Sequence, residues 1–166
     1  NFNEQIKYRY KTQFLDDNSV IGISSFLKNS LYIAHYDAAY RIFKENPIFG
    51  IGVKNYRLEA HKDKYRNDNL LRTESRGSTH PHQVHFEILS ETGLFGYMSF
   101  LILIGVSLYF SIKNYFRYKN VFQLSSIVFI LVFMIPFLPS GSFFSTFSST
   151  IFWLNYTIMM VYNKNY

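Results

Sequence analysis

Hydrophobic and polar positions divide the chain into a polar first half and an apolar second half. Every Asp and Glu residue lies at or before Glu91, and only four Lys or Arg residues follow it. Three apolar stretches occupy about 92–112, 121–138 and 143–162, and each approaches the roughly 20 residues that a helix needs to cross a bilayer. The pattern predicts an all-α integral membrane helical bundle, in which residues 92–166 supply three transmembrane helices.

A short basic segment between the first two apolar stretches predicts the orientation of this bundle. Lys113, Arg117 and Lys119 lie there without an acidic neighbour, and short loops with such a bias face the cytoplasm. Residues 1–91 then form a large, partly helical loop region on the outer side of the membrane. The chain begins with Asn1 rather than Met, so we expect a fragment of a longer protein with further transmembrane helices upstream.

The polar region has helix and turn signals of its own. A helix is predicted to begin after Ser30, which is a common N-cap residue type, and to end before Pro47. The stretch NPIFGIG then indicates a turn, in which Gly50 and Gly52 permit unusual backbone angles. A second helix is predicted over about 54–65.

Titratable side chains gather at the boundary between the two halves. The stretch STHPHQVHFEILSETGLFGY holds three histidines and two glutamates directly before the first apolar segment. Pro81 favours a helix start, which predicts that His82 lies in the first turn. The positive end of the helix dipole disfavours an imidazolium there, so His82 is expected to be neutral. A neutral imidazole can accept a proton from a hydroxyl group, as a general base must.

Arginines in the preceding segment are candidates for binding an anionic leaving group. The planar guanidinium group binds two phosphate oxygens at once, which suits a phosphate-bearing substrate. The candidates in this segment are Arg57, Arg66, Arg72 and Arg76.

The same residues admit other interpretations. The histidines, namely His80, His82 and His85, could lie at the surface, or they could bind zinc together with a carboxylate from Glu87 or Glu91. A helix that starts at Pro81 would point His80 away from the other two. The two glutamates stand one turn apart and could cap an exposed helix face. They make a poor glycoside hydrolase pair, because they do not face each other across a cleft.

Composition narrows the function classes. The chain has no cysteine, which excludes disulfides, thiolate metal sites and cysteine nucleophiles. Its formal net charge of +6 suits anionic lipid or a phosphate-bearing substrate. The apolar second half and the lack of a nucleic-acid motif argue against nucleic acid as a partner.

Two motifs together resemble the O-antigen ligase and O-antigen polymerase superfamily of bacterial envelope enzymes. The family carries a His followed by Asn, Ser or Gln, then nine residues and a Gly-x-x-Gly. Here His82 and Gln83 are followed by nine residues, then by Gly93 and Gly96. The stretch NPIFGIGVKNYR is similar to the segment that precedes the family's large periplasmic loop. The structural positions of the two motifs are Pro47, Gly50, Gly52, Gln83, Glu91, Gly93 and Gly96.

The resemblance implies glycosyl transfer at the periplasmic face of the bacterial inner membrane. The donor would be a glycan on undecaprenyl diphosphate, and the acceptor of a ligase would be a sugar hydroxyl of the lipid A core. The family's motif histidine, thought to be the base, maps onto His82, and no metal or other cofactor is expected. Arg57 lies in a matching motif and is expected to bind the diphosphate. The other candidates for that role are Arg72, Arg76, His80 and His85, which are close in sequence.

Two further functions stay open on the sequence alone. A polymerase would use the same chemistry to join lipid-linked repeat units. A non-enzymatic membrane protein, such as a scaffold or a transporter fragment, is the third possibility.

Overall fold

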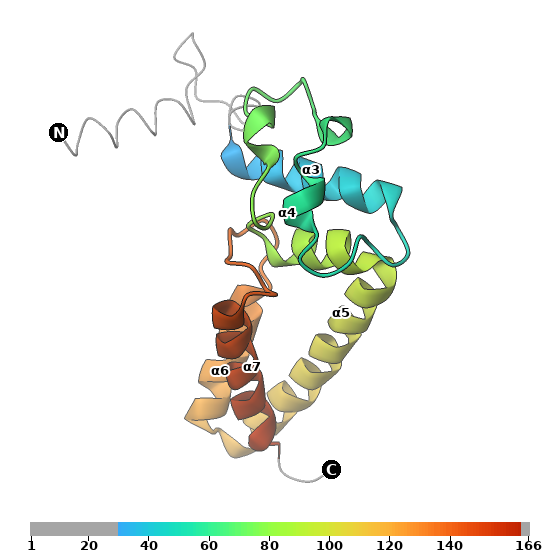
Figure 1. Cartoon of the computed structure of the whole chain (residues 1–166). Helices are drawn as coiled ribbons and strands as arrows, with labels where there is room; N and C mark the ends of the chain where they lie inside the picture. The colour runs from blue at the N-terminus through green and yellow to red at the C-terminus, as the bar shows by residue number, and fades with distance from the viewer. Residues whose placement is uncertain (1–29, 164–166) are drawn as a thin grey trace, which may run out of the picture.

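The regular elements in the described residues of this computed structural model, 30–163, are all helices, and these residues contain no strand. The first 29 residues of the predicted loop region lie outside the described part. The helices are α3 (Leu31–Glu45), α4 (Tyr56–Glu59), α5 (Val84–Tyr118), α6 (Val121–Phe133) and α7 (Thr146–Val161), with 3₁₀ turns at Asp63–Tyr65 and Thr73–Arg76 (Figure 1). The predicted all-α fold class is confirmed for this part of the chain.

Helix α3 lies beside the first segment of α5 (Figure 1). Its N-cap is Ser30, as predicted, and it ends one residue before Asn46, with Pro47 following. Small side chains on its buried face, such as Ala38 and Ala39, are almost fully covered. Small residues let two helices approach closely, so this face positions α3 over the residues that precede α5.

Helix α5 bends sharply at Gly93, which has φ 67° and ψ −170° (Figure 1). That combination is accessible almost only to glycine. The bend separates a short segment, 84–92, from a long one, 94–118. The long segment spans about 37 Å at 1.5 Å per residue, which exceeds the roughly 30 Å of a bilayer's hydrocarbon core.

The backbone groups left unpaired by the bend are bonded to the NPIFGIG turn. The amides of Ile51 and Gly52 donate to carbonyls of the short segment at 3.1 and 2.8 Å. In return, the amides of Leu94 and Phe95 donate to carbonyls of the turn at 2.8 and 3.2 Å. Helix ends carry such unpaired groups, and each needs a partner when it is buried. The turn therefore stabilises both sides of the bend.

Glycine is required on both sides of this contact. Gly50 and Gly93 each have φ 67°. A Cβ atom on Gly50 would clash with the backbone of Glu91, and one on Gly93 would clash with the backbone of Ile48. The two motifs that are separate in sequence thus meet backbone to backbone.

Helix α5 is the one helix of residues 30–163 that is long and apolar enough to cross a membrane. Helices α6 and α7 have 13 and 16 residues, fewer than predicted. The difference arises because residues 134–145, with prolines at 136 and 139, form an irregular connection that takes up the ends of both predicted spans. Three transmembrane helices stay a prediction.

The predicted second helix over 54–65 is shorter than expected. It consists of α4 and the 3₁₀ turn at Asp63–Tyr65. The carbonyls of His61 and Lys62 accept hydrogen bonds from the Arg76 guanidinium group at 3.2 and 3.3 Å. Because these carbonyls are turned toward a side chain, they are not used to continue a helix.

Candidate functional site

The helix that follows the histidine motif begins at Val84, so the predicted start at Pro81 is wrong. Gln83 is the N-cap, and its side chain accepts a hydrogen bond from the amide of Phe86 at 3.0 Å. His82 precedes the helix in a left-handed conformation with φ 57°. Its carbonyl accepts a hydrogen bond from the amide of Ser140 at 2.8 Å, which ties the motif to the α6–α7 connection.

His82 lies among other aromatic rings rather than in a helix turn. The centroid of its ring is 4.1 Å from that of His80 and 5.0 Å from that of His35. Its Nε2 atom lies 3.2 Å from the hydroxyl of Ser78. Burial lowers the pKa of His82 below its ordinary value. The expected neutral imidazole is therefore supported, but by burial instead of the helix dipole.

His80 is the histidine of the motif that faces a pocket. Burial, with a smaller contribution from the neighbouring His82, lowers the pKa of His80 to about 4. Its Nδ1 atom is 2.9 Å from the hydroxyl of Thr79. Its Nε2 atom is shielded from solvent and has no hydrogen-bond partner within the described residues. His80 thus presents a neutral ring to the pocket.

This pocket, of about 360 Å³, combines cationic and hydroxyl side chains from three separate segments. Lys54 and Arg57 come from the segment after the NPIFGIG turn, and the serines come from the α6–α7 connection and the first turn of α7. Unpaired amides and the helix dipole at the start of a helix favour an anion. The pocket is lined by Lys54, Arg57, Thr79, His80, Gly141, Ser142, Ser145 and Ser148. Its chemistry suits phosphate oxygens.

Arg57 and His80 are the predicted diphosphate ligands that the structure brings together. Lys54 was missed, although it stands in the same NPIFGIGVKNYR motif as Arg57. The serines of the pocket were also missed. Their signal is the recurrence of serine in the stretch SGSFFSTFSS, in which Ser142, Ser145 and Ser148 recur every three residues.

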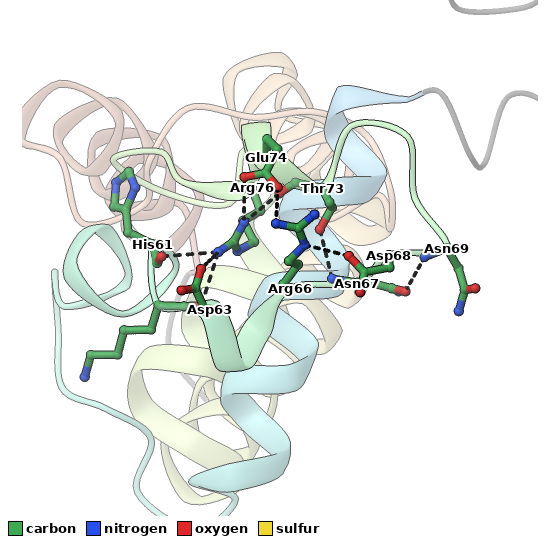
Figure 2. Close-up of polar contacts among 10 residues, drawn as sticks. His61, Asp63, Arg66, Asn67, Asp68, Asn69, Thr73, Glu74 and Arg76 are labelled. Atoms are coloured by element: carbon green, nitrogen blue, oxygen red, sulfur yellow. Dashed lines mark hydrogen bonds and ion pairs between the residues drawn. The ribbon is translucent and has the colours of Figure 1, made fainter.

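Arg76 is buried and bonded within its own segment, so its predicted role as a diphosphate ligand is not supported (Figure 2). Its guanidinium group donates to the carbonyl of Thr73 at 3.1 Å and to those of His61 and Lys62. Carboxylates of Asp63 and Glu74 lie at 3.5 and 3.7 Å. The two terminal nitrogens of the group thus hold the loop closed, because buried donors need partners nearby.

The other two arginine candidates also lie outside the pocket. Arg66 forms ion pairs with Asp68 and Glu74 at 2.5 and 2.6 Å (Figure 2). Arg72 precedes the 3₁₀ turn and does not line the pocket. Proximity in sequence was therefore a poor guide to proximity in space for these side chains.

His85 points away from the pocket, toward the α6–α7 connection. Its Nε2 atom is 2.9 Å from the carbonyl of Met134, and its Nδ1 atom is 3.0 Å from the hydroxyl of Tyr97. A carbonyl only accepts, so Nε2 donates and Nδ1 accepts from the tyrosine. This pair of hydrogen bonds gives His85 a structural role, and its predicted contact with the diphosphate is not supported.

Glu87 and Glu91 are buried, so the interpretation that they cap an exposed face is wrong. The Glu91 carboxylate accepts from the amides of Lys54 and Tyr56 at 2.6 and 3.0 Å. The Glu87 carboxylate accepts from the amide of Phe143 at 2.7 Å and from the hydroxyl of Ser142. Each carboxylate holds one wall of the pocket in place.

No three His, Asp or Glu side chains of residues 30–163 come together in a metal-binding group. The zinc interpretation of the histidine motif gains no support from this arrangement. The histidine rings lie against one another and do not converge on a point.

The family model described as O-antigen ligase matches residues 15–101, slightly more than half of the chain. The chain belongs to the O-antigen ligase family. Comparison with curated proteins and comparison with solved structures each give no match. Members of the family are membrane-associated, glycosyltransferase-like enzymes whose substrates are lipid-linked glycans.

The match to the O-antigen ligase family includes both motifs and the histidine cluster. It ends at Leu101, so the serine wall of the pocket lies outside it. The resemblance stated from the two motifs is confirmed at the level of the family.

Proposed function

We propose that this chain carries the base and part of the diphosphate site of an O-antigen ligase. The reaction would move a glycan from undecaprenyl diphosphate to a sugar hydroxyl of the lipid A core. The observation that carries the proposal is the contact between His82 and His80, because His80 lines a pocket that also presents Lys54 and Arg57. The proposed neutral base is therefore adjacent to a pocket whose cationic side chains can bind an anion.

In the proposed reaction, His82 accepts the proton of the acceptor hydroxyl. The hydroxyl oxygen attacks the anomeric carbon of the donor sugar and forms the new glycosidic bond. The bond between that carbon and the diphosphate oxygen breaks, and its electron pair leaves with the diphosphate. Lys54, Arg57 and the start of α7 stabilise the charge that develops on the leaving group.

The proposed setting is a multi-pass protein of the bacterial inner membrane with this site at the periplasmic face. The basic segment around Arg117 would then face the cytoplasm. Reporter fusions test the orientation. A fusion at Asn114 is expected to report the cytoplasm, and a fusion at Ser140 the periplasm. The reverse pattern would exclude a periplasmic site.

Complementation distinguishes ligase from polymerase. In a strain that lacks its ligase, expression of the intact gene is expected to restore glycan on lipid A. Restoration of chain length in a polymerase-deficient strain, without restoration of the ligase strain, would identify a polymerase. Failure in both strains, with normal membrane insertion, would favour a non-enzymatic protein.

Replacement of the base is expected to have the largest effect on activity. His82→Ala should lower the rate of transfer by about 10² to 10⁴, the range of general base catalysis. The matched control is His85→Ala, which should retain part of the activity because His85 holds the α6–α7 connection rather than substrate. Full activity of the His82 variant would contradict the proposed mechanism.

The pH profile tests the protonation state of the base. Burial lowers the pKa of His82, so it stays deprotonated as the pH falls through about 6.5, the value of an ordinary histidine. Activity should therefore persist at pH 6.5 and decline only at lower pH. The measurement is kcat/KM against pH. A decline that is half complete at or above 6.5 would contradict a neutral, buried base.

A further inference from the structure

We propose that His35 of α3 is a positioning residue that holds the ring of His82 in its working orientation. The inference rests on the proposed function, because it assigns a support to the proposed base. His35 lies 47 positions before His82 in the numbering, and neither motif includes it. The argument depends on the packing of α3 against the segment that precedes α5.

The contact between the two rings is direct and largely shielded from solvent. Their centroids are 5.0 Å apart, and the ring planes are inclined at 45°. His35 is 3% exposed, whereas His82 is only partly buried. Aromatic pairs at such distances are attractive beyond simple burial. His35 therefore forms a buried inner surface against which the more exposed ring of His82 rests.

The orientation of His35 is itself determined by its neighbours. Its Nδ1 atom is 3.0 Å from the carbonyl of Arg76. A carbonyl can only accept, so Nδ1 carries the hydrogen and the tautomer is defined. The hydroxyl of Tyr56 is 3.1 Å from the same carbonyl and 3.2 Å from the carbonyl of His35. The ring of His35 is thus held by its own hydrogen bond to the Arg76 carbonyl. The hydroxyl of Tyr56 holds both that carbonyl and the backbone of His35 in place.

This anchor extends to both motifs. The amide of Tyr56 is bonded to the carboxylate of Glu91, and the position of the Arg76 carbonyl is set by the buried guanidinium group of the same residue. Burial lowers the pKa of His35, which keeps its ring uncharged beside His82. A neutral neighbour adds no charge that would compete with protonation of the base during the reaction.

The backbone of His82 explains why such support is useful. Its φ of 57° lies in the left-handed region, which non-glycine residues seldom adopt and which tertiary contacts must maintain. Outside a helix, no neighbouring turn restricts its side chain. A displacement of about 1 Å in a catalytic group can lower a rate by roughly a hundredfold. The ring contact with His35 adds a buried restraint to the contacts that His82 makes with Ser78 and His80.

Two substitutions test the contribution of the His35 ring and that of its hydrogen bond separately. His35→Asn keeps an N–H donor near the Arg76 carbonyl but removes the ring that touches His82. His35→Phe keeps a ring of similar size and removes the donor. We expect His35→Asn to lower kcat about tenfold or more with KM changed less than about twofold, and His35→Phe to recover most of kcat. Tyr40→Asn, on the exposed face of α3, is the control for a general effect on the helix.

A second measurement does not depend on activity. Diethylpyrocarbonate modifies unprotonated imidazoles, and fragmentation mass spectrometry locates the modified histidine in the purified protein. His82 should react faster in His35→Asn than in the original protein, and at an unchanged rate in His35→Phe and Tyr40→Asn.

The outcomes are distinguishable from failure of the proposed function. Unchanged reactivity of His82 in His35→Asn would overturn the positioning inference, and so would an equal loss of kcat in both His35 variants. Normal transfer activity of the His82→Ala variant would instead overturn the assignment of His82 as the base. In that case, faster labelling in His35→Asn would still establish the contact between the two rings.

Discussion

The two ends of α5 are both held by buried polar side chains, but by different kinds. At its first segment, the carboxylates of Glu87 and Glu91 accept hydrogen bonds from loop amides. At its last turns, the amide of Asn114 donates to the side chain of Gln123 at 2.9 Å and to the carbonyl of Tyr162 at 2.6 Å. One end fixes irregular loops, and the other joins three helices.

The carboxylate end is suited to loops because loops leave backbone amides without partners. An ionised carboxylate provides about four acceptor sites and forms stronger hydrogen bonds than a neutral group. Glu91 satisfies two such amides, which follow the NPIFGIG turn. Glu87 accepts from one amide and one hydroxyl of the connection before α7. The two walls of the pocket therefore depend on adjacent turns of one helix.

The amide end is suited to helices because helix ends present carbonyls. The side-chain amide of Gln123 donates to the carbonyl of Met159 at 3.1 Å and to the side chain of Asn163 at 2.8 Å. The side chain of Asn163 donates in turn to Ser111 at 3.0 Å. These groups are uncharged, so their burial costs less than that of a carboxylate, and each bond contributes less. The comparison predicts a graded response to substitution.

The largest effect is expected at the bend between the two ends. Gly93→Ala should destabilise the fold by about 3 to 5 kcal/mol, because it adds a strained φ and a clash with the NPIFGIG turn. Thermal unfolding of the detergent-solubilised protein measures the change. Gly105→Ala is the matched control, since a Cβ there meets no atom within 4 Å. Equal melting temperatures for the two variants would contradict the backbone contact of Gly50 with Gly93.

An intermediate effect is expected at the carboxylate end. Glu91→Gln should cost about 2 kcal/mol, because one oxygen of the carboxylate becomes a donor that faces a backbone amide. It should also weaken substrate binding, since Lys54 and Tyr56 lose their anchor. KM and the unfolding temperature are the measurements, with Glu45→Gln, whose ion pair with Lys64 is exposed on both sides, as control. An effect no larger than that of the control would show that Glu91 does not hold the pocket wall.

The smallest effect is expected at the amide end. Asn114→Leu should cost about 1 kcal/mol, in the range found for hydrogen bonds between membrane helices. Catalytic constants should not change, because the cluster is at the far end of the long segment from the histidines. Thr157→Val, at an exposed position of α7, is the control. A destabilisation equal to that of Glu91→Gln would remove the distinction between the two ends.

Local signals in the sequence predicted the position of the long helix, the limits of α3 and the family. The change from charged to apolar residues after Glu91 predicted where the long helix lies, and Ser30 and Pro47 marked the limits of α3. The histidine and glycine spacing was sufficient to predict the family. These signals succeeded because hydropathy, capping and glycine conformation act between residues that are close along the chain.

Other features could not be predicted from the sequence, because they depend on contacts between distant segments. Arg76 was expected to bind phosphate, yet its two terminal nitrogens are bonded to nearby carbonyls and carboxylates once the loop closes. His35 carried no motif, and only the packing of α3 brings it to His82. Pro81 suggested a helix start, but the Gln83 side chain provides the cap and moves the start to Val84.

The sequence by itself determined the helical class, the apolar second half and the family. Only the tertiary structure decided which cations share a pocket, which glutamates are buried and which histidine rings lie against one another. The physical reason is that propensity and hydropathy are properties of short segments. By contrast, burial, desolvation and hydrogen-bond satisfaction depend on which distant groups exclude water from one another.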